Sequence, residues 1–324
     1  MWVEKYRPKK IEQIVNQKDI IKALNNLKKN PNEMPHMLFA GPAGVGKTTT
    51  ALCLANELLG DDWRNDTLEL NASDERGIKM VRERVKEFAA VIKLTGISEN
   101  NNEKPFRIII LDEADEMTSE AQTALRRIIE DSSKTTRFII ICNYLSQIIE
   151  PIQSRCAVFR FKRLDKENIV EHLKTICKLE KIQFEEEAIA QIFDFTYGDL
   201  RHSINVLQTA AGMNMGHVTK DNVNSAIGLS GKSKVGEIVR LALDGKFNDS
   251  RIKLMELIHV YGMSEKDFLK YAFQETFNKK FEKFGELSEI MAEYDYRLVV
   301  GAHPEIQLVA FLAQLGKLGK DERK

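Results

Sequence analysis

The segment "GPAGVGKT", residues 41–48, constrains the fold of this chain more than any other stretch. It follows the apolar run "HMLFA" at 36–40 and opens "TTTALCLANELLG", which has helical character. A glycine-rich turn between a buried strand and a helix, ending in Lys-Thr, is typical of a polyphosphate site. The glycines let backbone N–H groups curve round the phosphates, and the helix N-terminus adds its dipole. We therefore expect an α/β fold with a phosphate site at 41–48.

Two side chains of this segment carry specific chemistry. Lys47 is expected to reach the β- and γ-phosphates, and the Thr48 hydroxyl to bind Mg²⁺. The run "IIILDEAD" at 108–115 ends in adjacent carboxylates that point in alternate directions. We assign Asp112 to the metal and Glu113 to the general base that activates a water molecule. A solvated acidic turn is the alternative, which the phosphate loop upstream makes less attractive.

Asn143 follows the apolar run "FIIIC". In open α/β sheets ligands bind at the carboxyl ends of the strands, so its amide could orient the same water molecule. An asparagine at a strand end is also a common turn residue, and the sequence leaves both interpretations open.

The first half of the chain contains five apolar, β-branched runs, at 36–40, 67–72, 107–111, 137–142 and 157–161. Apolar strands that alternate with helical segments predict a doubly wound parallel sheet. After residue 163 only helical patterns follow, and the Gly/Ser-rich stretch 228–234 is the best linker candidate. We expect domains at 1–163, 164–230 and 231–324.

Lysine plus arginine (48) equals aspartate plus glutamate (48), so any basic surface must be local. The four cysteines form no CxxC pair, which argues against a zinc ribbon and a disulfide framework. The N-terminus lacks the pattern of a signal peptide, and the apolar runs are too short to span a bilayer. We expect a soluble, intracellular protein.

Several motifs of this chain resemble those of a known protein family. In chain order, "GPAGVGKT", "LDEAD", "SRC" and "GDLR" resemble those of AAA+ ATPases. "VEKYRP" and "NASDERG" narrow the resemblance to the clamp-loader small subunits of the replication factor C family, of archaeal type. The similarity extends to "HPEIQLVAFLAQL" near the end, which is similar to the collar helices of that family. It implies an AAA+ core with a five-stranded parallel sheet, a helical lid and an all-helical collar for oligomerisation.

The resemblance also implies a function. The chain would be an ATPase that uses ATP and Mg²⁺, is stimulated by DNA, and loads a sliding clamp onto primer-template DNA. Its partners would be a large subunit, further small subunits, the clamp and the DNA backbone, without a membrane. Its location would be cytoplasmic in an archaeon and nuclear in a eukaryote.

Two alternatives stand beside this function. A scaffold subunit that binds nucleotide without hydrolysing it would not need the intact set Lys47, Thr48, Asp112 and Glu113. A different AAA+ machine, such as a branch-migration helicase or an unfoldase, would need pore or hairpin elements, and none is recognisable here.

The nucleotide-binding residues can be placed on matching positions. "WVEKYRP" is similar to the segment that wraps the adenine, although Tyr6 could equally be a packed aromatic. Arg201 stands in the first turn of a helix, against the dipole, and resembles the sensor 2 arginine that reaches the γ-phosphate. Asn16 stands where the family more often has glycine. The full expected set is Val3, Tyr6, Arg7, Pro8, Gly41, Pro42, Ala43, Gly44, Val45, Gly46, Lys47, Thr48, Thr49, Asn143 and Arg201.

The segment "GIKMVRERVKEFAAVIK" predicts a helix with one buried face and a basic stripe of Lys79, Arg82 and Lys86. The resemblance implies that this stripe follows the DNA backbone, where contacts need no base sequence. The helix "SEAQTALRRIIED" is predicted to open with a capping box of Ser119 and Gln122. Its Arg126 and Arg127 could contact DNA or another subunit.

Arg155 stands in the tripeptide "SRC", and the carboxylate nearest to it in the sequence is that of Glu150. The resemblance implies that it reaches the γ-phosphate held by the next subunit, in trans. A surface ion pair is the alternative. The expected catalytic set is therefore Glu113, Lys47, Asn143, Arg201 and, from a neighbouring subunit, Arg155.

Overall fold

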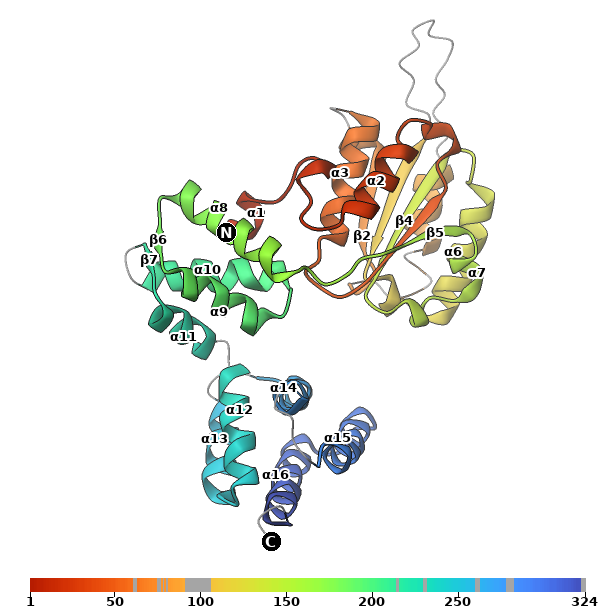
Figure 1. The fold of residues 1–324 in the computed structure, drawn as a ribbon. Helices are drawn as coiled ribbons and strands as arrows, with labels where there is room; N and C mark the ends of the chain where they lie inside the picture. Colours follow the sequence, from red (N-terminus) through yellow and green to blue (C-terminus); the bar gives the residue numbers. More distant parts are fainter. Residues whose placement is uncertain are drawn as a thin grey trace, which may run out of the picture. The chain divides into compact units, whose positions relative to one another are not determined.

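The computed structural model describes residues 1–60, 63–74, 77, 79, 81–90, 106–213, 216–229, 232–259, 263–277 and 283–321. The chain divides into two compact units, Met1–Thr219 and Lys220–Lys324 (Figure 1). Each is described by itself.

The first unit contains a five-stranded parallel sheet with the order β2-β3-β4-β1-β5. The strands are β1 (His36–Ala40), β2 (Thr67–Asn71), β3 (Arg107–Asp112), β4 (Thr136–Cys142) and β5 (Cys156–Arg160). All five coincide with the predicted runs to within a residue, and the predicted parallel sheet is confirmed. The middle strands β1 and β4 are buried along their whole length, which is why they have no polar alternation.

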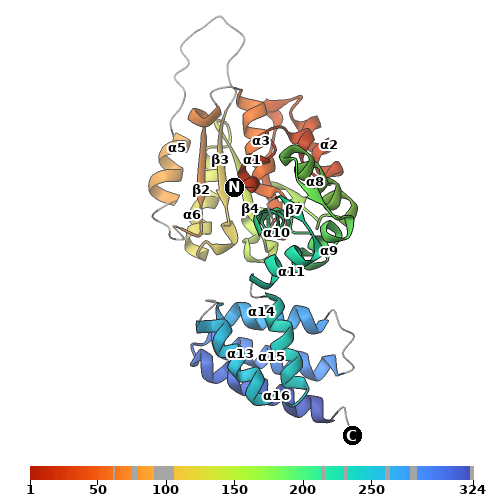
Figure 2. The ribbon, with the colours of Figure 1, turned by 90° about the vertical axis from the view of Figure 1, so that its left-hand side faces the viewer.

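Helices cover both faces of this sheet (Figures 1 and 2). Alternate strand residues divide between two cores: Leu38 and Ile140 pack on one face, and Phe39 and Ile139 on the other. The face of Phe39 is covered by α2 (Lys18–Leu27) and α3 (Lys47–Leu59). The opposite face is covered by α5 (Lys86–Ala90), α6 (Ser119–Asp131) and α7 (Glu150–Gln153). Short turns complete this part: α1 (Trp2–Lys5), η1 (Ile11–Gln13), η2 (Pro31–Glu33), η3 (Trp63–Asp66), η4 (Val81–Val85), η5 (Ala114–Glu116) and η6 (Leu145–Gln147).

Two details of the helices differ from the prediction. Val81–Val85 form a π-helical turn that α5 continues, where the pattern predicted one regular helix. The predicted capping box of α6 is wrong: Thr118 is the N-cap, and its hydroxyl accepts from the Ala121 N–H. The Gln122 side chain instead donates to the carbonyls of Met117 and Gln147 and accepts from the Ile149 N–H.

The remainder of the first unit is helical. It comprises α8 (Lys166–Glu180), α9 (Glu186–Thr196) and α10 (Leu200–Met213), with a small parallel pair, β6 (Gln183–Phe184) and β7 (His217–Val218). The pair was not predicted, because two-residue strands leave no periodic pattern in a sequence. We call residues 166–218 the lid segment.

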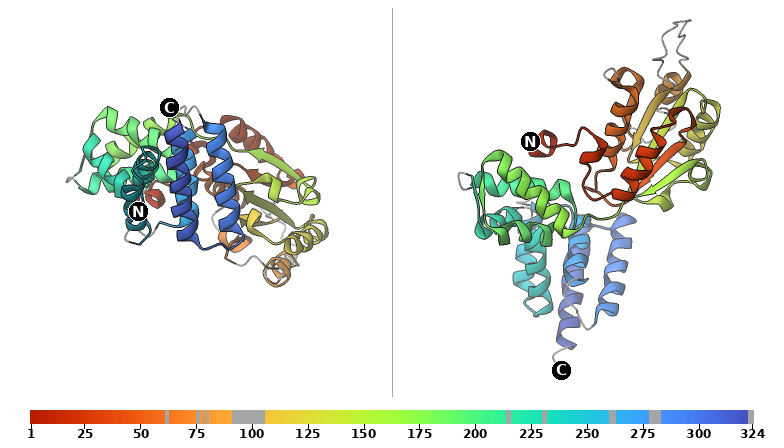
Figure 3. Two further views of the ribbon diagram at one scale, coloured as in Figure 1. Left: turned by 90° about the horizontal axis from the view of Figure 1, so that it is seen from below. Right: turned by 45° about the horizontal axis from the view of Figure 1, so that its top comes forward.

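The second unit is all-helical (Figure 3). Its helices are α11 (Lys220–Leu229), α12 (Lys232–Leu243), α13 (Phe247–His259), α14 (Glu265–Phe277), α15 (Phe284–Val299) and α16 (Pro304–Asp321). Helix α12 contacts α13, α14 and α16 around a core that contains Phe268, Tyr294 and Phe311. Among the described residues of the chain, no helix is both long enough and apolar enough to cross a membrane.

Candidate active site

A cavity of about 400 Å³ lies at the carboxyl ends of the central strands of the first unit. This is where open parallel sheets bind ligands, because the loops that leave the strands diverge there. Its wall includes the predicted residues Val3, Tyr6, Arg7, Pro8, Ala43, Gly44, Val45, Gly46, Lys47, Thr48, Thr49, Asp112, Glu113, Asn143 and Arg201. Residues from five separate parts of the sequence therefore surround one space.

The glycine-rich loop connects β1 to α3. Gly44 and Gly46 adopt positive φ angles of 73° and 94°, which favour glycine. A Cβ at Gly44 would also lie 1.9 Å from Asp199 Oδ1, so space excludes any side chain there. Gly41 and Pro42 do not line the cavity, but their carbonyl groups accept hydrogen bonds from Lys47 Nζ at 2.7 and 2.8 Å.

Lys47 is the buried cation of the site. Its Nζ also donates to Asn143 Oδ1 at 2.9 Å, which links the loop to the end of β4. Burial lowers the pKa of Lys47, and the nearby Asp112 carboxylate partly opposes this effect. The three oxygens that accept from Lys47 are neutral and do not cancel its charge. An anion bound beside this ammonium group would therefore stabilise it strongly.

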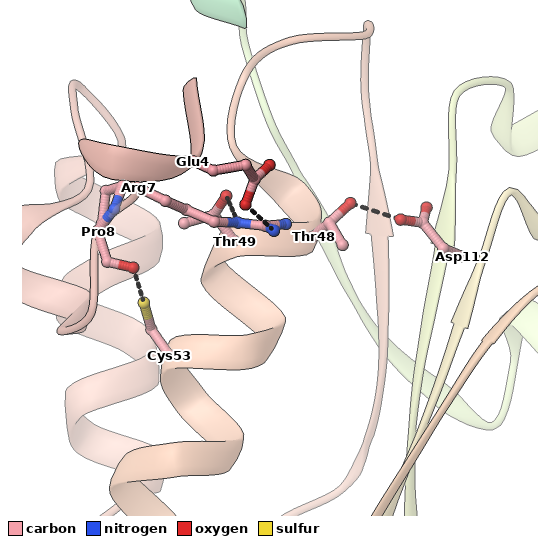
Figure 4. Close-up of polar contacts among 7 residues, drawn as sticks. All are labelled: Glu4, Arg7, Pro8, Thr48, Thr49, Cys53 and Asp112. Carbon is pink, nitrogen blue, oxygen red and sulfur yellow. Dashed lines mark hydrogen bonds and ion pairs between the residues drawn. The ribbon is translucent and has the colours of Figure 1, made fainter. Parts of the chain in front are cut away.

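Thr48 and Asp112 form the polar contact across the cavity (Figure 4). Thr48 Oγ1 donates to Asp112 Oδ2 at 2.6 Å. The two oxygens come from different elements, α3 and β3, and a hydroxyl beside a carboxylate is the hard donor set that Mg²⁺ prefers. The residues present thus fit a magnesium ion.

Glu113 lies directly after β3 and lines the same cavity. Its backbone is in the left-handed region, with φ 53° and ψ 38°, and its N–H donates to Asp112 Oδ1 at 2.8 Å. A non-glycine residue in this conformation is uncommon and costs about 1 kcal/mol or more. Asp112 and Glu113 thus line the same cavity from adjacent positions at the end of β3.

Asn143 is fixed by Asp115. Asp115 Oδ2 accepts from the backbone N–H groups of Asn143 and Tyr144 at 3.0 and 3.1 Å. Asp115 therefore has a structural role at the edge of the site. They hold the end of β4 against the turn after β3, so the Asn143 amide and the carboxylates have a defined spacing.

The N-terminal segment forms another wall of the cavity. Arg7 Nε donates to Thr49 Oγ1 at 3.3 Å, and Cys53 Sγ donates to the Pro8 carbonyl at 3.2 Å (Figure 4).

Asn16 has a φ of 56°, and its Nδ2 donates to Asp165 Oδ2 at 2.8 Å. Asparagine tolerates the left-handed region better than most residues, which explains how it occupies this position in place of glycine.

Arg201 is exposed at the start of α10 and lines the cavity. Asp199 caps the N-terminus of this helix: its Oδ1 accepts from the His202 N–H at 2.9 Å. The Leu200 N–H donates to the Gly44 carbonyl at 3.1 Å. The helix that carries Arg201 therefore begins in direct contact with the glycine-rich loop.

Sequence reasoning missed several residues of the cavity wall, namely Glu4, Ile14, Val15, Glu69, Asn71, Cys142, Leu164, His172, Leu200 and Ile204. Asn71 could have been found, since "LELN" ends in a polar residue just as "IILDE" does, and Asn71 pairs with Asp112 in the sheet register. Burial lowers the pKa of His172, so this imidazole is neutral at pH 7.

The remaining predicted residues lie elsewhere. Arg155 is half-exposed and does not line the cavity; its Nη2 lies 2.5 Å from Glu130 Oε1. Lys79 and Lys86 are exposed, whereas the side chain of Arg82 lies outside the described residues. Arg126 Nε lies 4.0 Å from Glu130 Oε1, and Arg127 is exposed.

The four cysteines lie apart from one another in the described residues. All four are free, and burial raises the pKa of the Cys142 and Cys156 thiols to about 12. Among the described residues, no group of His, Cys, Asp or Glu has the arrangement of a metal site of three or more ligands.

Three family models match successive parts of the chain, in the order predicted from the sequence. The model of the ATPase family associated with various cellular activities (AAA) matches residues 37–164. The RCF1/5-like AAA+ ATPase lid domain matches 171–212, and the replication factor C C-terminal domain matches 232–314. The predicted succession of AAA+ core, lid and helical C-terminal domain is confirmed.

Among solved structures, the chain resembles RuvB from Thermotoga maritima, with a TM-score of 0.58 and 16% identity over 82% of this chain and 84% of that one. A structure titled as the RuvB Holliday junction branch migration motor from the same organism gives a TM-score of 0.58 and 15% identity over 82% and 84%. At these identities the likeness concerns the fold alone.

Proteins of higher identity are replication factor C small subunits. The protein from Staphylothermus marinus is 50% identical over 99% of this chain and 95% of its own length. The proteins from Sulfolobus acidocaldarius and Sulfurisphaera tokodaii are 48% and 46% identical over 97% and 99% of this chain, and over 95% and 96% of their own lengths. Identity of this extent covers all three matched regions, and the chain belongs to the replication factor C small-subunit family of AAA+ ATPases.

Proposed function

We propose that this chain is an ATP-hydrolysing subunit of a clamp loader, which places a sliding clamp on primer-template DNA. The observation that carries the proposal is the convergence of Lys47, Thr48, Asp112, Glu113 and Asn143 on one cavity, in a chain of this family. Its complex would contain further small subunits and a large subunit. We assign the ATPase core to 1–163, the lid domain to 164–230 and the collar to 231–324.

The chemistry follows from the positions of the polar groups. The Lys47 ammonium and the N–H groups of the loop bind the triphosphate, and binding replaces the carbonyl oxygens around Lys47 with phosphate oxygens. Thr48 and Asp112 would hold Mg²⁺, which neutralises charge on the β- and γ-phosphates. Glu113 accepts the proton of the attacking water molecule, and Asn143 orients that molecule.

Arg155 does not line the cavity of its own chain, and we expect its guanidinium group to complete the cavity of a neighbouring subunit. We assign it to the γ-phosphate bound by an adjacent subunit, where an arginine can accelerate phosphoryl transfer by about 10³- to 10⁵-fold. The proposal explains why a hard-to-bury cation stands at the surface, outside the cavity of its own chain. A chain on its own should therefore hydrolyse ATP slowly.

DNA binding rests on Lys79, Arg82 and Lys86. The exposed positions of Lys79 and Lys86 support contacts to the phosphate backbone, and a few contacts in each of several subunits suffice. Replacing Lys86 by Ala should lower the slope of log affinity against log salt concentration by about 1 for each lost contact. Lys134→Ala, which removes another exposed lysine, should leave the slope unchanged.

The main test measures phosphate release by the assembled complex. We expect slow turnover without ligands, little change with clamp or DNA alone, and strong stimulation by both together. Equal rates with and without both ligands would contradict clamp loading. The alternative, a scaffold subunit that binds but does not hydrolyse ATP, predicts that Glu113→Gln leaves turnover of the complex unchanged.

A further inference from the structure

The N-terminal residues Trp2–Pro8, here called the strap, connect the lid segment to the glycine-rich loop helix. At one end the Trp2 N–H donates to Gln208 Oε1 of α10 at 2.8 Å. At the other end Arg7 and Pro8 bond to Thr49 and Cys53 of α3. The residues between these ends, Val3 and Tyr6 among them, line the cavity.

Packing fixes the strap only in part, because its residues are at most half-buried. None of the residues of α1, which forms most of it, is buried. A second hollow of about 330 Å³ lies beside the first and shares Tyr6, Arg7 and Pro8 with it. Helix α1 contacts α10, but a segment that is only partly buried and has space on two sides depends on its polar contacts for its exact position.

Glu180 makes the strongest of these contacts. Its Oε1 accepts from Lys5 Nζ and from the Tyr6 hydroxyl, each at 2.6 Å. Although it lies at a helix end, its side chain is only 18% exposed. These hydrogen bonds, that of Lys5 first, lower the pKa of the Glu180 carboxyl group.

The location of Glu180 is unfavourable for a carboxylate on local grounds. It is the last residue of α8, where the helix dipole repels negative charge. The neighbouring residues Lys178 and Lys181 are the kind of side chain that a helix C-terminus favours. The contacts with Lys5 and Tyr6 offset this cost, so the carboxylate is placed for the strap and not for its own helix.

We propose that Glu180 is a positioning residue for nucleotide binding: it holds the Tyr6 ring at the cavity wall and thereby couples occupancy of the base site to the position of the lid segment. The inference rests on the proposed function, in that the cavity is taken to bind a purine nucleotide. A base that contacts Tyr6 then meets a side chain whose far end is bonded to α8. Loss of that bond leaves the ring free to turn away, which weakens binding without touching the phosphate groups.

The test uses the full chain and ATP, with binding measured by calorimetry. Tyr6→Phe keeps the ring and deletes only the hydroxyl group, and Glu180→Ala deletes the acceptor. Each should weaken ATP binding roughly three- to tenfold, which is the range expected for loss of one ordinary intramolecular hydrogen bond. The affinity of the double variant for ATP should equal that of the single variant with the lower affinity, because both changes remove the same hydrogen bond.

A spectroscopic readout separates positioning from general stability. The chain has two tryptophans, Trp2 and Trp63, so Trp63→Phe leaves Trp2 on the strap as the only reporter. ATP should change the emission of Trp2 in this background, and Glu180→Ala should abolish the change. Glu180→Gln, which keeps an acceptor oxygen for the Tyr6 hydroxyl, should restore part of it.

Asp194→Ala is the matched control, because Asp194 pairs with Lys166 at 2.7 Å within the same lid segment and does not line the cavity. It should change neither affinity nor emission. Wild-type affinity and an unchanged Trp2 response in Glu180→Ala and Tyr6→Phe would overturn the inference, as would additive losses in the double variant. Failure of the wild-type chain to bind ATP would instead overturn the proposed function.

Discussion

The guanidinium group of Arg155 lies 2.5 Å from the carboxylate of Glu130, which stands near the end of α6. Arg155 Nη1 also donates to the Pro151 carbonyl at 2.7 Å. The two side chains of the ion pair are 37% and 41% exposed, and pairs of this kind contribute at most about 1 kcal/mol. Glu130 therefore supplies the in-chain partner that the sequence around Arg155 lacks, but it holds the cation too weakly to prevent an exchange for phosphate.

The first prediction concerns Arg155 in the assembled complex. Arg155→Ala should lower kcat by at least about 100-fold, because a cation is lost where charge develops, and change the KM for ATP little. Where copies of this chain adjoin, mixing Arg155→Ala with Glu113→Gln chains should restore part of the turnover, since one interface then has both groups. Mixtures as inactive as the separate variants would show that Arg155 does not act in trans.

The second prediction concerns the metal. Asp112→Asn keeps an oxygen that can accept from Thr48 Oγ1 but removes the charge that a magnesium ion requires. ATP binding in EDTA should match the wild-type chain, whereas the Mg²⁺ concentration needed for half-maximal turnover should rise at least about tenfold. Thr48→Ser, which keeps the hydroxyl, is the control. An unchanged Mg²⁺ dependence in Asp112→Asn would remove Asp112 from the metal site.

The third prediction tests the backbone at Asn16. Asn16→Gly should change the free energy of unfolding by less than about 0.5 kcal/mol, because glycine accepts the positive φ and loses only one exposed hydrogen bond. Asn16→Val should destabilise by about 1 to 2 kcal/mol, since a branched side chain is strained there. Urea unfolding measures both, and Asp165→Ala removes the same hydrogen bond without a backbone change. Equal stability of the Gly and Val variants would contradict the argument.

The fourth prediction is a pH dependence of stability. Burial, with a smaller contribution from Arg137, lowers the pKa of His36 to about 4, against about 6.5 in the unfolded chain. Between these values the unfolded chain binds a proton that the folded chain does not, so stability falls as the pH falls from 6.5 to 4. The loss attributable to His36 is about 3 kcal/mol at pH 4.

His36→Gln tests this dependence, because a neutral amide can still accept from the Phe138 N–H, as His36 Nδ1 does at 3.2 Å. The difference in unfolding free energy between the variant and the wild-type chain should shift in favour of the variant as the pH falls through this window. A difference that stays constant from pH 7 to pH 4.5 would contradict the assignment.

The fifth prediction concerns the thiols. Burial raises the pKa of Cys53 and Cys177 to about 11, and that of Cys142 and Cys156 to about 12. Their thiolate fractions at pH 8 are small, so a disulfide reagent should react at least about 100-fold more slowly with the native chain than with the unfolded chain. A cysteine introduced at the exposed Lys134 should react at the unfolded rate and serves as the control. Rapid native labelling would contradict this prediction.

The sheet was predictable because its strands are apolar on both faces and because glycine and lysine mark the loop after β1. The bounds of β1 agree completely, those of β2, β3 and β4 differ by a residue at one end, and β5 is shifted by a residue at both ends. Asp112 ends β3, and Glu113 and Asn143 directly follow strands, so the topology alone brings these residues to one edge of the sheet. The apolar pattern of each strand, and the parallel orientation implied by the helical segments between strands, can both be recognised in a sequence.

The long-range partners were not predictable. Glu130 is separated from Arg155 by a helix turn, a strand and a loop, and Glu180 reads as an ordinary charged residue at the end of an amphipathic helix. Which carboxylate meets which cation depends on how helices pack, and the spacing of residues along the chain does not encode that. Glu69 was missed for a related reason, because its place in the cavity depends on the strand order.

The left-handed backbone of Glu113 has a consequence for how this chain can change. Glycine would relieve the conformation at this position, so the most stable residue there is one that cannot accept a proton. Selection for stability alone would therefore remove the side chain that we propose as the general base. Consensus or thermostability design applied to this fold should keep Glu113 unchanged. On the proposed function, its replacement by glycine would stabilise the fold and abolish turnover.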